Sequence, residues 1–381
     1  MTADSKRICI VSAQYLPHVG GVENYVASFS KELISRGYAV TIITSKAKDL
    51  PDYEDHENLE IFRLPTWQLM NGRFPITYPS IKRHRLLKQI KQRKFTAMLV
   101  NVRFYFLSLL AVKLSKKWRC PCVLLDHGSG HLTMQGKLAT QFGEWFEHWI
   151  TKREIRFSPR FAAVSKVSAK WLEHFGIHTD FVLPNAVDLQ EFKQLTKRSS
   201  RDFIAEYEVP KGSTVISFVG RLTKEKGVLE MCESFCKIAE KREDVYLFLA
   251  GDGYLRTAIE KNYPRIICLG VLSKAEVLQL NQQSDIFCLP SVSEGFCTAI
   301  LEAAVCKCYI VATEVGGAVD IVKTEAHGSL LRDRDPKTIA EALQYAIDDP
   351  QKRRIGVELC RQEVEQNFTW GHTVDRFLEN L

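Results

Sequence analysis

Short apolar runs rich in β-branched residues alternate along the chain with longer stretches whose apolar residues recur at helical spacing. The runs in the first half are ICIVSA (8–13), VTIITS (40–45), AMLV (97–100), CVLLD (122–126), FAAVS (161–165) and FVLPN (181–185). Those in the second half are TVISFVG (214–220), VYLFLAG (245–251), IICLG (266–270), IFCLP (286–290) and YIVAT (309–313). Strands that alternate with helices predict parallel sheets covered on both faces.

Helical patterns fill most of the intervals, as in residues 22–37, where apolar residues occupy positions 22, 25, 26, 29 and 33. Two series of similar size in a chain of 381 residues predict an α/β protein with two doubly wound Rossmann-like domains and a cleft between them. The polar stretch 188–202 is the predicted linker.

Composition favours a globular protein, with 45% hydrophobic and 25% charged residues. We expect no signal peptide, because residues 1–30 lack an apolar h-region, and no membrane span, because no apolar run approaches about 18 residues. The eleven cysteines show no paired metal spacing and predict reduced thiols in a cytosolic protein. Residues 1–183 carry 27 Lys and Arg against 15 Asp and Glu, a net charge of +12, whereas the remainder carries −5. The two halves are therefore expected to bind different partners.

Polar and glycine-rich turns follow several strand runs, at the sheet edge where open parallel sheets bind ligands. After the first strand, VGGVE (19–23) offers Gly20 and Gly21, whose backbone can approach an anion; a plain strand-to-helix turn is the alternative. GRLTKEKG (220–227) places Arg221 and Lys226 before a helix, where cations oppose the dipole unless an anion lies between them. A surface salt bridge to Glu225 is the alternative there.

Two histidines, His127 and His131, lie in the glycine loop DHGSGH (126–131). A structural histidine is the alternative to a ligand-binding one, and the loop does not favour a metal site. RDRDP (332–336) has the form of a metal-binding D-x-D, but a solvated loop is the better interpretation. GDG (251–253) is a weak signal by itself. We expect no metal.

Two glutamates eight positions apart mark LPSVSEGFCTAILEAA (289–304). Glu294 follows Ser291 by three residues, as in a capping box, and Glu302 lies in a predicted helix. Capping alone remains an interpretation of Glu294 at this point.

Taken in order, these motifs resemble those of the retaining GT-B glycosyltransferases of family 4, also called group 1. The motifs are GGVE (20–23), His127, PNAVD (184–188), GRLTKEKG, GDG and SEGFCTAILEAA (293–304), and they span nearly the whole chain. The resemblance implies an acceptor-binding domain at 1–187, a nucleotide-sugar-binding domain at 188–365, and a last helix at 366–381 that returns to the first domain.

The resemblance also implies roles for individual residues. Glu302 would hold ribose hydroxyls and Glu294 the donor sugar, while Arg221 and Lys226 would neutralise the leaving diphosphate. The backbone of Gly295, Phe296 and Cys297 would meet the diphosphate and sugar, and that of Gly20 and Gly21 would approach the diphosphate. His127 would contact the sugar near the reacting carbon. The implied catalytic set is His127, Glu294, Arg221 and Lys226. Cys297 stands where the family usually has Gly or Pro, and Ala186 stands where it has Gly; the change beside the sugar pocket leaves the identity of the donor sugar open.

The basic first half suggests an acceptor attached to lipid. Residues 81–95 interleave apolar residues with seven cations, which predicts an amphipathic helix on anionic headgroups. The cations are Lys82, Arg83, Arg85, Lys88, Lys91, Arg93 and Lys94. A solvated helix is the alternative, and nucleic acid is not an expected partner. We expect a cytoplasmic location, with peripheral contact at the inner face of the plasma membrane if the acceptor is lipid-linked.

The predicted function is transfer, with retention, of a hexose or N-acetylhexosamine from a nucleotide-diphosphate sugar to an acceptor hydroxyl. The acceptor is expected to be a lipid-linked glycan or glycolipid in polysaccharide or glycolipid biosynthesis. The alternatives are a soluble small-molecule acceptor and a non-catalytic sugar-nucleotide-binding protein. A dehydrogenase is disfavoured because the turn after the first strand lacks G-x-G-x-x-G. No cofactor is expected, since the nucleotide sugar is a substrate.

Overall fold

The structure, a computed structural model, describes residues 6–18, 20–47, 49–70, 72–131, 136–179, 181–198 and 200–381. Val19 of the VGGVE turn and Ser199 of the predicted linker lie outside these residues. The chain forms two compact units, one of Met1–Pro184 with Trp370–Leu381 and one of Asn185–Thr369.

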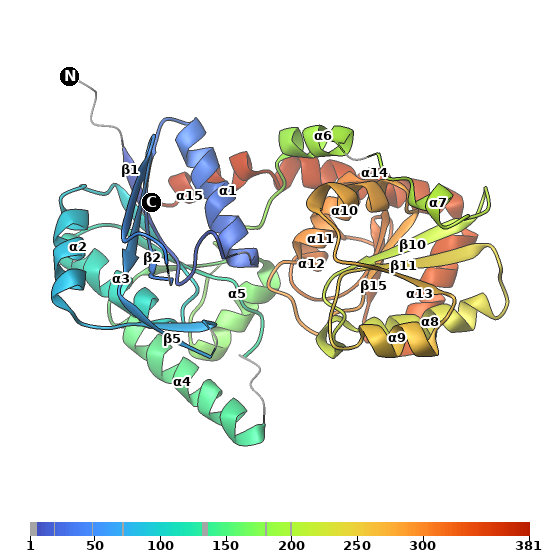
Figure 1. Cartoon of the computed structure of the whole chain (residues 1–381), viewed down its shortest axis with the longest axis horizontal. Coiled ribbons are helices and arrows are strands. Elements are labelled where there is room, and N and C mark those ends of the chain that lie inside the picture. Colours follow the sequence, from blue (N-terminus) through green and yellow to red (C-terminus); the bar gives the residue numbers. More distant parts are fainter. Residues whose placement is uncertain are drawn as a thin grey trace. The chain divides into compact units, whose positions relative to one another are not determined.

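The first unit is built around a large sheet and a separate hairpin (Figure 1). Its strands are β1 (Arg7–Val11), β2 (Ala39–Ser45), β3 (Tyr53–His56), β4 (Leu59–Leu64), β5 (Thr66–Leu69), β6 (Phe74–Thr77), β7 (Ala97–Asn101), β8 (Cys122–Asp126) and β9 (Arg160–Ala163). Its helices are α1 (Gly21–Ser35), α2 (Ile81–Lys91), α3 (Phe106–Trp118), α4 (Lys137–Ile155), α5 (Lys166–Leu172), the 3-10 helix η1 (Glu173–Phe175) and α15 (Trp370–Glu379).

The large sheet has the order β3-β4-β2-β1-β7-β8-β9 and is parallel except for the β3–β4 pair. Its central strands are buried along their length, as continuous apolar runs predict for a sheet covered on both faces. Strand β1 lies between β2 and β7, and the chain adds strands first on the β2 side and then on the β7 side. The loops that follow β1 and β7 therefore begin at a topological switch point.

The second unit contains one parallel sheet (Figure 1). Its strands are β10 (Thr214–Val219), β11 (Val245–Ala250), β12 (Ile266–Gly270), β13 (Ile286–Leu289), β14 (Tyr309–Thr313) and β15 (Gly328–Leu331). Its helices are α6 (Leu189–Arg198), α7 (Phe203–Glu206), η2 (Lys224–Lys226), α8 (Val228–Ala239), α9 (Arg256–Asn262), α10 (Lys274–Gln282), α11 (Thr298–Val305), α12 (Ala318–Ile321), α13 (Pro336–Asp348) and α14 (Pro350–Asn367).

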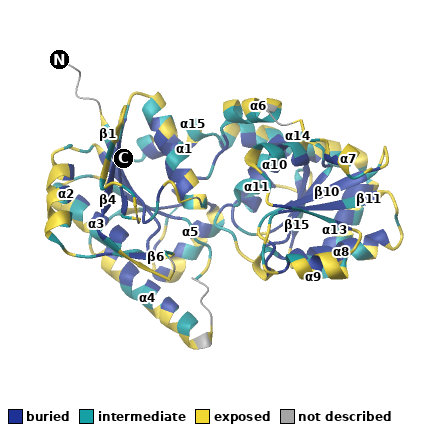
Figure 2. Cartoon of the chain, viewed as in Figure 1, coloured by how far each residue is buried: buried dark blue, intermediate teal, exposed yellow. Residues whose placement is uncertain are grey.

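The order of this second sheet is β12-β11-β10-β13-β14-β15, that of a Rossmann sheet. Every strand pair in it is parallel. Buried residues concentrate on the strands and on the helix faces turned toward them, as Figure 2 shows. The prediction of two α/β units with parallel sheets is therefore confirmed.

Two predictions about local structure were wrong. The expected linker forms α6, because Leu189, Phe192 and Leu195 line one face of a helix that packs on α10. Asp188 begins this helix by accepting hydrogen bonds from the backbone N–H groups of residues 190 and 191. The run FVLPN makes only an isolated bridge from Val182 to β9, and Pro184 has no N–H with which to continue the pairing.

Strand β4 was missed by the sequence analysis, although it pairs with β2 over six residues. Its sequence LEIFRL carries charges at Glu60 and Arg63, and the structure buries both in ion pairs. Glu60 accepts from Arg93 at 2.6 Å, and Arg63 pairs with Glu54. Charged residues in a buried strand are uncommon unless paired, so the apolar pattern gave no signal for β4.

Helix α15 brings the C-terminus of the chain back to the first unit, where it packs on α1. Phe377 is fully buried there, with its ring 5.4 Å from that of Phe29 in an edge-on arrangement. No helix among the described residues is both long enough and apolar enough to span a bilayer. All eleven cysteines are free thiols.

Candidate active site

The loops that carry the predicted donor-binding residues of the second unit begin at the carboxyl ends of β10 and β13. These two strands are neighbours, and the strand order reverses between them. The loop after β10 carries Arg221 and Lys226, and the loop after β13 carries Glu294. A switch point is where open α/β sheets bind ligands, because the two loops diverge there.

Lys226 and Glu294 are brought together across these loops, 68 positions apart in sequence. The Lys226 ammonium contacts Oε1 of Glu294, and the Ser291 hydroxyl donates to the same oxygen at 2.7 Å. A backbone hydrogen bond of 2.8 Å from Val292 N–H to the Glu225 carbonyl joins the loops beside this pair. The capping interpretation of Glu294 was wrong, because α11 begins only after Cys297 and has no side-chain cap.

Gly227 allows the close approach of the two loops. It has a φ of +68°, and a Cβ there would lie 2.0 Å from the carbonyl oxygen of Pro290. Only glycine fits both the left-handed backbone and the contact. Packing alone therefore requires a glycine at this position, whatever the neighbouring Lys226 binds.

Arg221 presents the second cation of the site. Its side chain is exposed and makes no hydrogen bond or ion pair with any residue that the structure describes. Lys226 is held by a carboxylate, whereas Arg221 can turn toward a ligand. The two together offer one positioned and one adaptable cation to an anion.

Glu302 lies in α11, one turn after its beginning. Burial raises the pKa of its carboxyl group, and the positive charge of Lys274 opposes that rise. Across the described ranges of the chain, no side chain or N–H group forms a hydrogen bond or ion pair with this carboxylate. A half-buried carboxylate without a partner is costly unless a ligand supplies hydroxyl groups.

The segment between the two glutamates is locally unusual. Cys297 adopts a left-handed backbone with a φ of +72°, a region that favours glycine. Burial raises the pKa of its thiol to about 12, so this thiol is not a nucleophile near neutral pH. The Phe296 side chain is buried and packs on Phe368, which leaves only its backbone for a ligand.

The GDG turn has a packing role in the structure. A Cβ on Gly251 would lie 1.9 Å from the Gly220 carbonyl oxygen, and one on Gly253 would lie 2.3 Å from that of Leu222. The absence of side chains lets the β11 loop support the loop that carries Arg221. The GDG turn therefore supports the loop that carries Arg221 through backbone packing.

In the first unit, Gly20 precedes α1 in an extended conformation and Gly21 is the first residue of that helix. A Cβ on Gly21 would meet no atom within 4 Å, whereas one on Gly20 would meet the carboxylate of Glu23. Glu23 is buried in the first turn, 3.3 Å from His18 Nδ1. Open space beside Gly21 is what close approach of a ligand to this backbone would need.

His127 follows β8, and its Nε2 lies 3.0 Å from Oδ1 of Asn101. Asn101 Nδ2 donates to the Val11 carbonyl, so its oxygen faces the ring and accepts from Nε2–H. Nδ1 is then left with a lone pair that can accept a hydrogen bond. Burial lowers the pKa of His127 to about 3, which keeps the ring neutral. Tyr25 packs edge-on against it at 5.0 Å.

Asn101 is a residue that the sequence analysis missed. It is fully buried at the end of β7, between β1 and the His127 loop. The signal was a polar residue directly after the apolar run AMLV, at the edge of the sheet where ligand-binding loops begin. Asn101 acts through His127 and is a positioning residue.

RDRDP forms the loop before α13, as expected. Asp335 caps that helix by accepting from the Lys337 N–H at 2.8 Å, and Pro336 occupies its first turn. Arg334 pairs with Glu230 at 2.8 Å. The aspartates thus serve helix capping and loop structure.

The prediction that 81–95 forms a lipid-binding amphipathic helix needs correction. The segment forms α2, but Leu86 and Ile90 are buried in the core of the first unit, because β4 lies beneath them. Arg93 is bound to Glu60, and Lys82 pairs with Asp52 at 2.5 Å. The surface of α2 therefore carries its charged residues and one exposed apolar residue, Ile81.

Comparison with solved structures identifies the fold class. HepE from Anabaena, crystallised in complex with UDP and glucose, superposes with a TM-score of 0.70 at 18% identity, covering 98% of this chain and 99% of that one. The two Rossmann-like units have the GT-B fold.

Sequence comparison narrows this class to a family. The profile of Glycosyl transferases group 1 matches residues 199–359, and that of Glycosyltransferase Family 4 matches residues 19–191. A GDP-mannose-dependent alpha-mannosyltransferase of Corynebacterium glutamicum is 26% identical over 98% of this chain and 88% of its own. A phosphatidylinositol N-acetylglucosaminyltransferase component from Arabidopsis thaliana is 25% identical over 97% of this chain and 80% of its own. The chain belongs to the group 1 glycosyltransferases of family 4.

Proposed function

We propose that this glycosyltransferase moves a hexose or N-acetylhexosamine, with retention, from a nucleotide-diphosphate sugar to a hydroxyl of a lipid-linked acceptor. The observation that carries the proposal is the grouping of Lys226, Glu294 and Glu302 at the switch point of the second sheet, where the Glu302 carboxylate has no hydrogen-bond partner among the described residues. A diphosphate needs cations, and a ribose needs a hydrogen-bond acceptor. Both kinds of group follow β10 and β13.

Donor binding is assigned as follows. Glu302 accepts hydrogen bonds from the ribose hydroxyls, which would supply the partner that its carboxylate lacks. Lys226 and Arg221 bind the diphosphate, and Lys226 thereby shares its charge between the phosphate and Glu294. The Glu294 carboxylate then accepts from hydroxyls of the donor sugar. The backbone of Gly295 and Cys297 meets the diphosphate at the beginning of α11.

The transfer step follows from this assignment. The bond between the anomeric carbon and the phosphate oxygen breaks, and a new bond to the acceptor oxygen forms on the same face of the sugar. The acceptor proton passes to the leaving phosphate. Arg221 and Lys226 stabilise the charge that develops on that phosphate, the kind of preorganised electrostatic effect that dominates many enzymes. Nδ1 of His127 accepts a hydrogen bond from a sugar hydroxyl and thereby orients the sugar ring.

The Arg221 and Lys226 side chains would take the part that a divalent metal plays in other sugar transferases. We accordingly propose that transfer proceeds without an added metal ion. Transfer measured in EDTA at the rate seen without EDTA would support this, and loss of transfer that Mg²⁺ or Mn²⁺ restores would overturn it.

The donor assignment is tested by thermal shift with UDP, GDP, ADP and their common sugar conjugates. A ligand that binds only the folded state raises apparent stability, by about 2.7 kcal/mol at a hundredfold excess over its Kd. We expect one nucleotide family to respond and Glu302→Gln to weaken that response at least tenfold in Kd. Glu325→Gln, an exposed acid of the same unit, is the control. If no nucleotide shifts the protein, the donor site is wrong.

Retention is tested separately with the responding sugar nucleotide. The anomeric configuration of the first-formed product is read by proton NMR against that of the donor. Inversion would refute the one-face step while leaving donor binding intact. Donor binding without any transfer or hydrolysis would instead favour a non-catalytic sugar-nucleotide-binding protein.

For the acceptor, we propose that α4 contacts an anionic lipid surface. The distribution of residues on this helix is opposite to that of an ordinary surface helix. Its acidic residues Glu147 and Glu154 are buried, whereas its aromatic residues Phe142 and Trp145 are 62% and 59% exposed. Figure 2 shows exposed residues along α4. Exposed cations follow toward its end, namely Lys152, Arg153 and Arg156. Exposed aromatic rings beside cations suit the interface of an anionic bilayer.

The adjacent hairpin extends the same apolar surface. Trp67 of β5 is 60% exposed, and Phe74 of β6 packs edge-on against Phe146 of α4 at 5.6 Å. One relative is named for transfer to phosphatidylinositol, which also supports a lipid acceptor. The basic charge of the first half agrees with attraction to such a surface.

Cosedimentation with vesicles of phosphatidylcholine, with and without phosphatidylglycerol, tests this surface. We expect binding that needs the anionic lipid and falls at least tenfold in the double variant Phe142→Ser, Trp145→Ser. Val271→Ser, which changes an exposed apolar residue of the second unit, should bind as wild type does. Failure of all forms to bind vesicles would favour a soluble acceptor and would leave the donor assignment untouched.

A further inference from the structure

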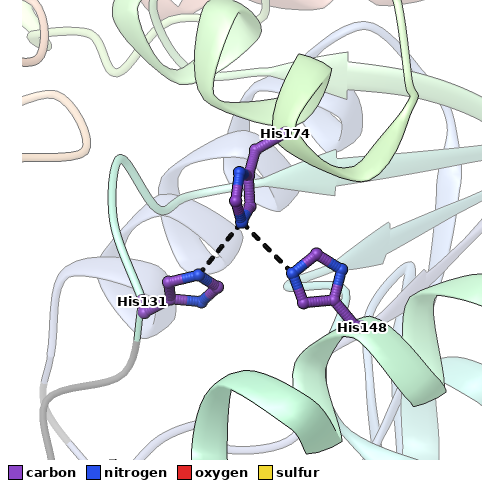
Figure 3. Close-up of side chains that lie close together, drawn as sticks. All are labelled: His131, His148 and His174. Carbon is purple, nitrogen blue, oxygen red and sulfur yellow. Dashed lines mark hydrogen bonds between the residues drawn. The ribbon is translucent and has the colours of Figure 1, made fainter. Parts of the chain in front are cut away.

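Three histidine rings converge in the first unit, and none of them belongs to the residues assigned to the donor. His131 comes from the loop after β8, His148 from α4 and His174 from η1, and Figure 3 shows their rings turned toward one another. Nε2 of His174 lies 3.2 Å from Nε2 of His131 and 3.1 Å from Nε2 of His148. One ligand nitrogen from each ring lies within 4.8 Å of the other two.

The hydrogen-bonding capacity of these rings does not match their geometry. A neutral imidazole nitrogen carries either one proton or one lone pair. Nε2 of His174 faces two other ring nitrogens, so one atom with a single proton or lone pair stands in two contacts of hydrogen-bond length. A cation that accepts all three lone pairs satisfies every nitrogen at once.

We propose that His131, His148 and His174 bind one divalent transition-metal ion, with Zn²⁺ the ion best suited to three neutral imidazoles. Zn²⁺ prefers about 2.0–2.1 Å to each nitrogen, which in a tetrahedral site separates the nitrogens by about 3.3 Å. The two separations of 3.1 and 3.2 Å are close to that value. Three protein ligands leave a fourth position for water or another ligand.

A buried carboxylate lies behind one of the ligands, as is typical of metal-bound histidines. Oε2 of Glu147 is 3.5 Å from Nδ1 of His131, and the same oxygen accepts from Nη2 of Arg103 at 2.9 Å. Nδ1 of His131 is itself buried and makes no hydrogen bond with a described residue. A proton on Nδ1, on the side of the ring that faces Glu147, leaves the Nε2 lone pair directed into the cluster.

The charge balance around the cluster also favours a cation. Asp126, Glu147 and Glu154 are fully buried, and Arg103 is the buried cation beside them, with Nε 3.4 Å from Asp126. Neither oxygen of the Glu154 carboxyl group has a hydrogen-bond partner among the described residues. Burial raises the pKa of Asp126 and of Glu154, and the positive charge of Arg103 opposes both rises. A divalent ion bound next to Glu147 would likewise favour the ionised forms of these buried carboxyl groups.

Aromatic side chains hold the remaining two ligands. The His174 ring stacks on Trp171 at 5.0 Å with an interplanar angle of 11°, and His148 lies 4.7 Å from the ring of Phe175. Arg103 covers the same Phe175 ring at 3.7 Å. These contacts restrict the rotamers of the rings before any ion binds, which lowers the entropic cost of metal binding.

The ion would tie together three segments that are far apart in sequence. His131 is 43 positions from His174, and His148 is 26 positions from it. Because His131 closes the loop that carries His127, the ion would fix the end of that loop to α4 and η1. Its role is positioning of the loop, so a loss of transfer in EDTA that Zn²⁺ but neither Mg²⁺ nor Mn²⁺ restores would reflect this site and not a metal at the donor diphosphate.

The experiment uses the untagged full-length chain, since a histidine tag would bind metal itself. Protein treated with EDTA and desalted is titrated with Zn²⁺ against a chromophoric zinc indicator, and bound zinc is counted by mass spectrometry. Wild type should bind one equivalent. His148→Ala and His174→Ala should each bind at least tenfold more weakly. His178→Ala, an exposed histidine four residues beyond the cluster, should match wild type.

Co²⁺ provides a second readout that reports geometry. A three-histidine site with one water should give the intense visible absorption of tetrahedral Co²⁺ in wild type and His178→Ala, and lose it in His148→Ala. Circular dichroism of the metal-free variants checks that each is folded; a misfolded Ala variant is replaced by the Gln variant. Equal zinc binding by wild type and both ligand variants, or no saturable binding by wild type, would overturn the proposal.

Discussion

Gly21 and His127 show how much the environment of one residue can decide. Both follow strands of the first sheet at its carboxyl edge, and the structure gives them opposite surroundings. Gly21 borders open space, whereas His127 is enclosed by Asn101 and Tyr25. We therefore expect that Gly21 can be substituted without disturbing the fold, and that protonation of the His127 ring lowers the stability of the folded protein.

Gly21→Ala should separate function from folding. Its added Cβ meets no atom and its φ is not positive, so the variant should be as stable as wild type or about 0.5–1 kcal/mol more stable. If the donor diphosphate approaches this backbone, kcat/KM should fall at least tenfold. Asn24→Ala, an exposed change in the same helix, should keep full activity. Unchanged activity in Gly21→Ala would remove Gly21 from the donor site.

His127 should make stability depend on pH. The pKa of the ring is about 3 when folded, against an ordinary value of about 6.5, so only the unfolded chain takes up the proton between these values. Stability is therefore fully present above pH 6.5 and falls as pH drops toward 3. The loss due to this ring is at most about 1.4 kcal/mol per pH unit.

Urea denaturation at pH 7, 6, 5 and 4 tests the His127 prediction. Wild type should lose more stability over this range than His127→Gln, whose side chain does not titrate. Parallel curves for the two proteins would show that the ring is already protonated or is solvated in the fold. The Asn101 contact is tested with Asn101→Asp, which should reduce the difference by stabilising a charged ring.

At the scale of elements, glycines allow loops to approach one another. Gly251 follows β11 and touches the loop after β10 so closely that any side chain would collide with backbone. Gly212 also has a positive φ, of +92°, but an added Cβ there would meet no atom within 4 Å. Comparing substitutions at Gly251 and Gly212 therefore distinguishes the effect of backbone strain from that of steric overlap.

Gly251→Ala should destabilise the protein by roughly 2–6 kcal/mol, from strain of about 1–3 kcal/mol together with overpacking of a similar size. Gly212→Ala should cost only about 1 kcal/mol, since it carries the strain alone. Thermal unfolding of both variants measures the difference. Equal losses would show that the β10 and β11 loops are not in contact in the way the structure has them.

At the scale of the whole molecule, the chain leaves the first unit at Pro184 and returns to it at Trp370. The first unit is therefore completed by the last helix, which is synthesised after the whole of the second. All six tryptophans fall in the first unit, since Trp370 belongs to α15. Tryptophan fluorescence consequently reports on the first unit alone, whereas circular dichroism reports on both.

Phe377→Ala should weaken the first unit selectively. The ring is fully buried against Phe29, and truncating such a side chain costs about 3–5 kcal/mol. The midpoint of the fluorescence transition should fall, while the part of the dichroism signal that comes from the second unit should not move. Leu381→Ala, at the exposed end of the chain, is the control. A common shift of both signals would mean that the two units unfold together.

The sequence by itself determined the fold class, because most of the buried strands are continuous apolar runs and the helices have apolar residues at a period of 3.6. Both patterns can be recognised in the sequence without knowing which elements pack together. It also located Arg221, Lys226, Glu294 and Glu302, since glycines and charged residues that directly follow an apolar strand mark the edge of the sheet where ligands bind. It failed at β4 and α6, where polar residues concealed the pattern, and it also missed the four-residue strands β3, β5, β6 and β15.

Only the tertiary structure could decide which distant residues meet. The contact of Lys226 with Glu294 spans 68 positions, Asn101 reaches His127 across the order of the strands, and the apolar residues of α2 turned out to face the core. The three histidines come from a loop and two helices with no common spacing. The sequence gives the chemical type of each side chain. The distances between elements depend on the packing of the whole unit, and no local sequence pattern predicts these distances.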